Sequence, residues 1–425
     1  MIRETDHLTV GLGPAQPGGL LDALSERDDW VDLRIFGALL VGWYDLFTKK
    51  GVTLLSGFYG PIERILLAQG HTVEFIPSDF RGFTRAVHHL KPRVVGVTVA
   101  PPDEEGRLSL ALHAGAGVAD LYDACSDPDR LVIAEINPAV PRTFGLPPDH
   151  PHCVHIDDVD VVYETDHAPF ELVEPPPSSV EVAIAEHCSR YVHDGSTLQT
   201  GIGGIPNAVM KLLAEGDGND FGVHSEMFTT GLMKLHQAGK VTNKKGVYDG
   251  FSPATFAAGT RELYEWLDQN EAVRFLPVEY VNDPSIIARN RDFVSINGAL
   301  SVDLQGQIVA DSIAGDQFSG IGGHMDFVSG ALGAPHGHSL ICLPSTAGND
   351  AKRVSRIVPQ HPSGALVTTP RHQTDVIVTE WGTAELANRT VAERAEALIE
   401  IAHPAVRDAL RQGATELPDI APDAE

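Results

Sequence analysis

A chain of 425 residues exceeds what one compact core usually holds, so we expect two domains. Its 58 acidic residues against 31 basic ones give a formal charge of −27, which argues against a nucleic-acid partner because phosphate binding needs clustered Lys and Arg. No apolar run approaches the length of about 18 residues that a membrane span requires, and the N-terminus lacks the basic-then-apolar order of a signal peptide, so we expect a cytoplasmic protein without a membrane partner.

The N-terminal half alternates short runs of branched residues with helical patterns. Residues 7–13, 93–100 and 129–136 are typical of buried strands, whereas residues 17–27 have the apolar spacing of a helix. Alternation of this kind predicts a largely parallel sheet with helices on both faces.

A cluster of potential metal ligands, DHPHCVH, occupies residues 149–155. The alternative interpretation is a Pro-rich surface loop ahead of a strand, which we favour because no second ligand cluster completes a tetrahedral set. The four cysteines are scattered without a CxxC pair, which favours free thiols. We therefore expect no metal site.

The segment 167–181 is the most Pro-rich part of the chain and contains three consecutive prolines. Such a run stiffens a connection and cannot continue a helix or a central strand. We place a domain boundary near residue 178, which gives predicted domains at 1–178 and 179–425.

The C-terminal half has the same style of sequence. Helical patterns occupy residues 179–192 and 390–402, and strand patterns occur at 293–303, 339–344, 364–369 and 376–382. The predicted fold class is α/β, with two tandem open domains built on mainly parallel sheets.

The two halves also share an apparent internal repeat. Residues 9–24 match residues 198–213, each as a strand, a glycine-rich turn and a helix. The same count from the first glycine of each turn leads to Phe36 in the first half and to Glu226 in the second. If the chain arose by duplication, only one copy carries the acid, and the fold does not need it.

Two glycine-rich segments are candidate ligand loops. In GIGGI, residues 201–205, glycines let the backbone approach a ligand, and the following helix offers unpaired N–H groups to a phosphate or an oxyanion. The dinucleotide spacing G-x-G-x-x-G is broken by Pro206, so a plain tight turn is the alternative. Residues 317–330 form the second segment, and their Met and Phe favour an ordered ligand loop over a linker.

Glu226 follows a mostly apolar strand pattern in GVHSEMFTTG. A carboxylate in this place is either desolvated, with a raised pKa, or stabilised by nearby donors, and in both cases it can act as a general base or a nucleophile. The alternative is a surface Glu at a strand–helix junction. Glu279, which also follows a strand-like run, is a rival nucleophile.

Several motifs that occur in order resemble the acetyl-CoA hydrolase/transferase family, whose members are class I CoA-transferases. The C-terminal half contains GIGGIPNAV, GVHSEMFTTG, VEYVNDP, SINGALSVDLQGQIVADSI, FSGIGGHMDFVSGA, VTEWGTAEL and IAHP. The N-terminal half matches more loosely, through APPDEEGRLSL and VIAEINPAVPRTFG. The most similar branch is that of the 4-hydroxybutyrate CoA-transferases.

The resemblance implies that Glu226 is the catalytic residue. It attacks the acyl-CoA carbonyl to form an anhydride, which the released CoA thiolate converts to a glutamyl-CoA thioester. Negative charge on each tetrahedral intermediate can be stabilised by the backbone N–H groups of Ile205 and Gly320. The resemblance further implies that CoA is bound by Asn297, Gln317, Gly320 and the glycine turn, which comprises Gly201, Ile202, Gly203, Gly204 and Ile205.

Three functions follow from these motifs. We favour a CoA-transferase that uses a short-chain or hydroxy carboxylate of the acetate or 4-hydroxybutyrate type, with an acetyl-CoA hydrolase on the same fold as the alternative. A catalytically silent acyl-CoA-binding protein is disfavoured because Glu226 is present. As a nucleophile, Glu279 ranks below Glu226 because it does not have the family's distance from the glycine turn. The expected partners are acyl-CoA and small carboxylates, with coenzyme A as co-substrate, no permanently bound cofactor, and a homo-oligomer, expected to be a homodimer.

Overall fold

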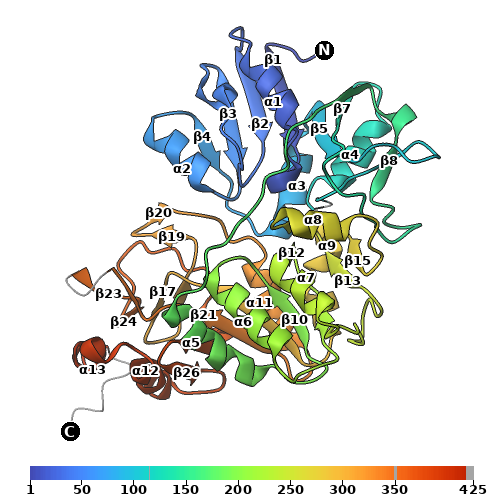
Figure 1. Ribbon diagram of the computed structural model, residues 1–425. Coiled ribbons are helices and arrows are strands. Elements are labelled where there is room, and N and C mark those ends of the chain that lie inside the picture. Colours follow the sequence, from blue (N-terminus) through green and yellow to red (C-terminus); the bar gives the residue numbers. More distant parts are fainter. Residues whose placement is uncertain (114, 349–351, 418–425) are drawn as a thin grey trace.

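The computed structural model describes residues 1–113, 115–348 and 352–417. Figure 1 shows two α/β regions, one coloured blue to teal and the other green to red. Each region is built on one open sheet whose strands are parallel except for one edge strand in the second sheet. The predicted α/β fold with two tandem, mainly parallel sheets is therefore confirmed.

Seven parallel strands form the sheet of the first region, in the order β4-β3-β2-β1-β5-β7-β9. Their bounds are β1 (Thr5–Val10), β2 (Asp32–Phe36), β3 (Val52–Ser56), β4 (Val73–Phe75), β5 (Val94–Val99), β7 (Leu131–Ile136) and β9 (Val161–Glu164). The helices are α1 (Gly18–Ser25), α2 (Pro61–Ala68), α3 (Phe80–Leu90) and α4 (Val118–Cys125). Leu21 of α1 joins the core on one face and Leu121 of α4 the core on the other, which explains why β5 and β7 are buried almost throughout.

The segment 149–155, a candidate ligand cluster in the sequence, ends in one strand of a short antiparallel pair. Its strands are β6 (Arg107–Ser109) and β8 (Cys153–His155). His152 is buried, and its Nε2 lies 2.9 Å from the hydroxyl oxygen of Thr143. In the part of the chain that the structure describes, no three His, Cys, Asp or Glu side chains are grouped to hold a metal ion.

The second region begins at α5 (Ser179–Cys188). Its N-cap is Ser178, whose hydroxyl accepts the N–H of Glu181, so the helix starts directly after the proline run. The two sheets lie on either side of this point in the sequence. A division into domains 1–178 and 179–425 stays a prediction about independent units, as does the internal duplication.

Six strands form the second sheet, in the order β11-β10-β16-β21-β25-β26. Their bounds are β10 (Thr197–Thr200), β11 (Gly222–Val223), β16 (Phe293–Gly298), β21 (His338–Cys342), β25 (Val376–Thr379) and β26 (Gly382–Glu385). The longer helices of this region are α6 (Gly204–Glu215), α7 (Thr230–Gln237), α11 (His324–Gly333), α12 (Val391–Glu400) and α13 (Arg407–Ala414). None of the described helices has the length and apolar character that crossing a bilayer demands.

One strand prediction is wrong. Residues 364–369 form no strand, and only Thr369 makes an isolated bridge, to Ile308. Gly364 has a φ of 87°, and Leu366 and Val367 are about half exposed, so these branched residues have no sheet to pack on. The pattern at 293–303 is divided between β16 and a separate strand, β17 (Ser301–Asp303).

The remaining elements are short, and those drawn in yellow lie between the two regions in Figure 1. They are α8 (Arg261–Leu267), α9 (Val278–Val281), α10 (Pro284–Ile287), the parallel pairs β12 (Met227–Thr229) with β14 (Phe256–Ala258) and β13 (Ser252–Ala254) with β15 (Val273–Phe275), and the small strands β17 (Ser301–Asp303), β18 (Ile308–Val309), β19 (Ser312–Ile313), β20 (Asp316–Gln317), β22 (Thr346–Ala347), β23 (Val354–Ser355) and β24 (Ile357–Val358). Apolar residues of both regions share one core here: Phe36 and Phe80 pack with Met227 and Phe256, and the rings of Phe80 and Phe256 are 5.9 Å apart. This shared core borders the cavity described next.

Candidate active site

Glu226 lies between β11 and β12, where the chain leaves the second sheet. Its backbone carbonyl accepts the N–H groups of Thr255 (2.8 Å) and Phe256 (3.3 Å), which fixes the main chain against β14. Its side chain faces a cavity between the two regions rather than the outer surface. The alternative of a solvated Glu at a strand–helix junction is therefore wrong.

Three polar side chains organise the carboxyl group of Glu226. The Asn282 amide donates to Glu226 Oε2 (2.6 Å) and to Asp326 Oδ2 (3.3 Å), so one amide holds two acids. Arg81 of α3 pairs with the other oxygen of Asp326 through its Nε (2.9 Å). A chain of polar contacts thus runs from the first region to the acid in the second.

Burial dominates the acidity of this pair. Desolvation raises the pKa of Glu226 to about 8, the Asn282 amide opposes this shift, and the nearby Asp326 adds to it. Burial likewise raises the pKa of Asp326 to about 7, against the opposing charge of Arg81. The anion of Glu226 is thus poorly solvated, which makes it a strong nucleophile once it is ionised.

The second glycine loop packs directly against Glu226. A Cβ at Gly323 would lie 2.0 Å from Glu226 Oε2 and 2.5 Å from the Asn282 amide nitrogen, so only glycine fits there. The nearby backbone N–H of Gly323 lowers the pKa of Glu226, against the larger effect of burial. Gly322 has a φ of 57°, in the left-handed region that favours glycine, and turns the loop toward α11.

A cavity of about 420 Å³ opens beside Glu226. The second region contributes polar groups around the glycine turn, among them Gln199, Thr200 and Asn297. The first region contributes a mostly apolar wall, made of Leu12, Gly13, Ala38, Leu39, Phe58, Phe80, Phe83 and His113. Glu226 is the one carboxylate among the described residues that line this space.

The structure brings five of the residues singled out in the sequence to this cavity. They are Glu226, Gly201, Ile202, Asn297 and Gly320. The remaining four, Gly203, Gly204, Ile205 and Gln317, do not line it. Their roles in CoA or oxyanion binding stay predictions.

Hydrogen bonds or helix membership define the setting of three of these four residues. The N–H of Gly203 is taken by the carboxylate of Glu174, which comes from the proline-rich connection, and Ile205 lies in the first turn of α6. Gln317 donates to Asp311 Oδ2 (2.9 Å) and to the Ser319 carbonyl (3.0 Å). Gln317 therefore braces the loop that carries Gly320.

The two histidines near Glu226 and the rival acid, Glu279, have different surroundings from those of Glu226. His224 is fully buried, with Nε2 2.7 Å from the Val281 carbonyl oxygen. His324 lines the cavity, and its Nε2 lies 2.8 Å from the Thr369 hydroxyl. Glu279 lies in α9 and is absent from the cavity lining.

The sequence analysis gave no individual role to Asn282, Asp326, Arg81 or Gly323, although Gly323 and Asp326 lie in the predicted ligand loop 317–330. Asn282 lies in VEYVNDP, and Asp326 and Gly323 lie in FSGIGGHMDFVSGA, so both motifs contained a signal. Arg81 lies on α3, far away in the sequence, and its contact with Asp326 exists only in the folded chain.

Comparison with known proteins is consistent with this geometry. A family model described as "Acetyl-CoA hydrolase/transferase C-terminal domain" matches residues 259–414. The 4-hydroxybutyrate coenzyme A transferase of Clostridium kluyveri is 37% identical over 404 residues, which cover 93% of this chain and 90% of that protein. The chain belongs to the acetyl-CoA hydrolase/transferase family.

Other members of the family are similar over nearly their whole length. The butyryl-CoA:acetate CoA-transferase of Anaerostipes caccae is 35% identical over 96% of this chain and 92% of that protein. The structure of RipA from Yersinia pestis has a TM-score of 0.87 at 35% identity, with 97% of this chain and 94% of that one covered. The 4-hydroxybutyrate CoA-transferase of Porphyromonas gingivalis has a TM-score of 0.77 at 30% identity. The protein is accordingly an enzyme of the CoA-transferase class.

Proposed function

We propose that this CoA-transferase moves CoA between a short acyl group and a free short-chain or hydroxy carboxylate through a thioester on Glu226. The observation that carries the proposal is that Glu226, held by the Asn282 amide and packed against Gly323, is the one carboxylate among the described residues that line the cavity. Coenzyme A enters as a co-substrate, and the reaction needs no other group.

The reaction proceeds through two acyl transfers. A Glu226 oxygen attacks the thioester carbonyl, the C–S bond breaks, and CoA leaves as a thiolate. The thiolate then attacks Cδ of Glu226 in the resulting anhydride, which releases the first carboxylate and leaves glutamyl-CoA. An incoming carboxylate reverses both steps, and the anhydride and the thioester replace one difficult transfer by easier ones.

Each attack places negative charge on a carbonyl oxygen that backbone donors can hold. We assign this role to the glycine loop at Gly320 and to the first turn of α6 at Ile205, whose N–H groups have no partner within the helix. Asn297 and the turn at Gly201 and Ile202 are proposed to contact CoA, because they line the polar side of the cavity.

The apolar wall of the cavity supports transfer over hydrolysis. Phe58, Phe80 and Phe83 border the same space as Glu226, and apolar surroundings keep water from the glutamyl thioester. Loss of CoA from the adduct without an acceptor acid would instead identify an acetyl-CoA hydrolase. We also propose a cytoplasmic homodimer.

Mass spectrometry of the covalent adduct tests this function. After incubation with acetyl-CoA or 4-hydroxybutyryl-CoA, the peptide that contains Glu226 should gain CoA, and borohydride should reduce the thioester to an alcohol. Glu279→Gln is the matched control and should keep the adduct. The proposal is wrong if no short acyl-CoA gives an adduct and Glu226→Ala retains full transfer activity.

A further inference from the structure

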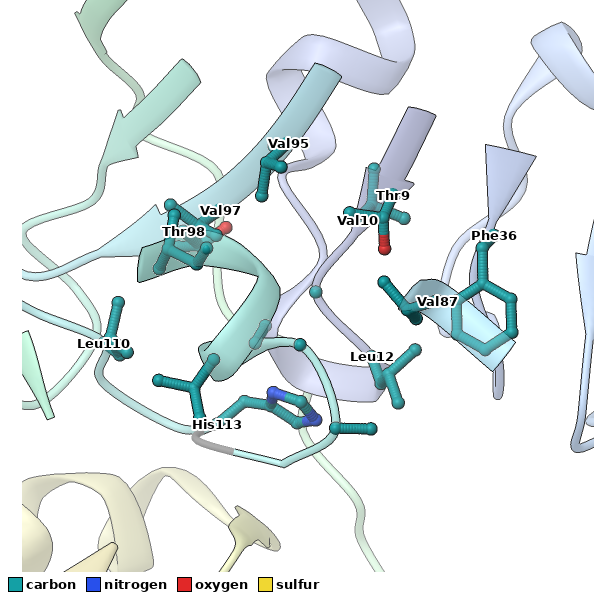
Figure 2. A pocket seen from close by; sticks show the side chains of 17 residues that line it. Thr9, Val10, Leu12, Phe36, Val87, Val95, Val97, Thr98, Leu110 and His113 are labelled. Atoms are coloured by element: carbon teal, nitrogen blue, oxygen red, sulfur yellow. The ribbon is translucent and has the colours of Figure 1, made fainter. Parts of the chain in front are cut away.

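His113 occupies a distinctive place in the first region. Its side chain is only 8% exposed, and its Nε2 has no hydrogen-bond partner among the residues that the structure describes. It lines both the reaction cavity and a second, smaller cavity of about 40 Å³. Figure 2 shows its imidazole next to Leu12 among the side chains that line this smaller cavity.

The strand pairing places His113 within reach of a group attached to Glu226. Met227, the next residue after Glu226, pairs with Phe256, and Phe256 makes an antiparallel bridge to His113 on its other side. Two strand spacings, roughly 9–10 Å, therefore separate the main chains of Met227 and His113. The rings of His113 and Phe256 are 6.2 Å apart. A short unbranched acyl chain extending from Glu226 can span this interval.

His113 is the one polar side chain among the described residues that the first region contributes to the wall of the reaction cavity. Every other residue that the first region contributes to the reaction cavity is apolar or glycine. Thr98 lines the smaller cavity, and its buried hydroxyl also has no partner among the described residues. An unpaired buried polar atom costs free energy, so a ligand that supplies a partner is favoured.

The charge of this pocket excludes one substrate class. Burial lowers the pKa of His113 to about 4, so the ring is neutral at physiological pH. Of the described residues that line the two cavities, none is a lysine or an arginine. A second carboxylate at the far end of the acyl group would therefore lack a counter-charge.

We propose that His113 is a specificity-determining residue whose Nε2 hydrogen-bonds the hydroxyl group of a short ω-hydroxyacyl chain bound to Glu226. The smaller cavity has room for about one water-sized group beyond the imidazole, which limits the chain to a few carbons. Substrates with an uncharged polar end are preferred over fully apolar ones, and dicarboxylates are rejected. This inference rests on the proposed covalent function.

Acceptor kinetics with acetyl-CoA as donor test the inference. For the wild-type enzyme, kcat/KM for 4-hydroxybutyrate should exceed that for butyrate about tenfold, and that for succinate by more, because one hydrogen bond is worth about this factor. His113→Leu should abolish the preference for 4-hydroxybutyrate, and His113→Gln should retain part of it. Exchange of isotopically labelled acetate into acetyl-CoA by the wild-type enzyme shows whether the covalent route itself operates.

Two controls distinguish a failure of the proposed function from a failure of the inference about His113. Absence of labelled-acetate exchange by the wild-type enzyme, together with absence of a Glu226 adduct, overturns the proposed function. Labelled-acetate exchange by the wild-type enzyme, together with an unaltered ratio of kcat/KM for 4-hydroxybutyrate to kcat/KM for butyrate in His113→Leu, overturns only the inference. If His113→Leu fails to fold, the imidazole ¹⁵N resonances of the wild-type enzyme decide: Nε2 of His113 should shift with the 4-hydroxybutyryl group and not with the butyryl group, and equal shifts would contradict the proposal.

Discussion

The two α/β regions use similar strand–turn–helix segments in different ways. After β1, the turn is closed by the backbone of its own region: Gly11 donates to the Gly96 carbonyl (3.2 Å) and Gly13 to the Ala38 carbonyl (3.3 Å). After β10, the N–H of Gly203 instead meets the side-chain carboxylate of Glu174. A turn whose N–H groups bind a carboxylate is one that can also bind an anionic ligand.

The same contrast holds for the positions that the apparent repeat equates. Phe36 is buried at the end of β2 and packs edge-to-face on Phe83, with their centroids 5.8 Å apart. Glu226 lies in a polar network with Asn282 and Asp326. At these equated positions the first region thus has a packed aromatic ring, whereas the second has a carboxylate that faces the cavity.

The largest effect is expected when the second region loses its acid. Glu226→Ala should lower the transfer rate by about four orders of magnitude or more, because the covalent route is lost. Phe36→Leu at the equated position should keep most of the activity and lower the free energy of unfolding by about 1–2 kcal/mol. Initial rates and urea unfolding measure both outcomes, and comparable loss of activity in the two variants would remove the contrast.

A methyl group in the glycine loop should have the next largest effect. In Gly323→Ala the new Cβ collides with Glu226 Oε2 and the Asn282 amide, so the carboxylate must move. We expect kcat to fall by about 10²–10³-fold, comparable to the loss of one oxyanion donor. A melting temperature near that of the wild type, measured in parallel, would assign this loss to the site rather than to folding.

The acidity of Glu226 should be visible in the pH profile. Its pKa is raised to about 8, and a protonated carboxyl does not attack a thioester. We therefore expect kcat/KM for acyl-CoA to rise with pH up to about 8, with a tenfold change per unit on the acidic limb. Because Asp326 titrates close by, the limb reports the pair. A flat profile between pH 6 and 8 would contradict a raised pKa.

Asp326→Asn should shift the acidic limb of the pH profile of kcat/KM. Its negative charge helps to raise the pKa of Glu226, so its removal should lower the pKa and shift the limb toward lower pH by about one unit or less. The rate at the pH optimum should change less than in Gly323→Ala. A shift toward higher pH would mean that the contact between Asp326 and Arg81, rather than the charge of Asp326, determines the pKa of Glu226.

The smallest expected effect concerns the glycine turn. Glu174→Gln removes a negative charge at the start of α6, where CoA is proposed to bind. The KM for acyl-CoA should fall about two- to threefold with kcat unchanged, the size of a typical charge effect at a helix terminus. An increase in KM would show that Glu174 mainly anchors the connection between the two regions.

Local patterns in the sequence predicted most elements and the position of the acid. Alternating strand and helix patterns predicted two parallel sheets, and α5 begins one residue after the predicted boundary at 178. The strand predicted at 364–369 failed because β-propensity requires a surface to pack on, and Leu366 and Val367 have none.

The sequence by itself determined the fold class, the family motifs and Glu226 as the candidate nucleophile, because strand periodicity, glycine turns and ordered motifs are local properties of the chain. Only the tertiary structure decided which groups surround that acid. Asn282, Gly323 and Asp326 reach Glu226 from two later segments, while Arg81 and His113 come from the first region. Such contacts depend on how two sheets pack against each other, and no spacing within one segment encodes that distance.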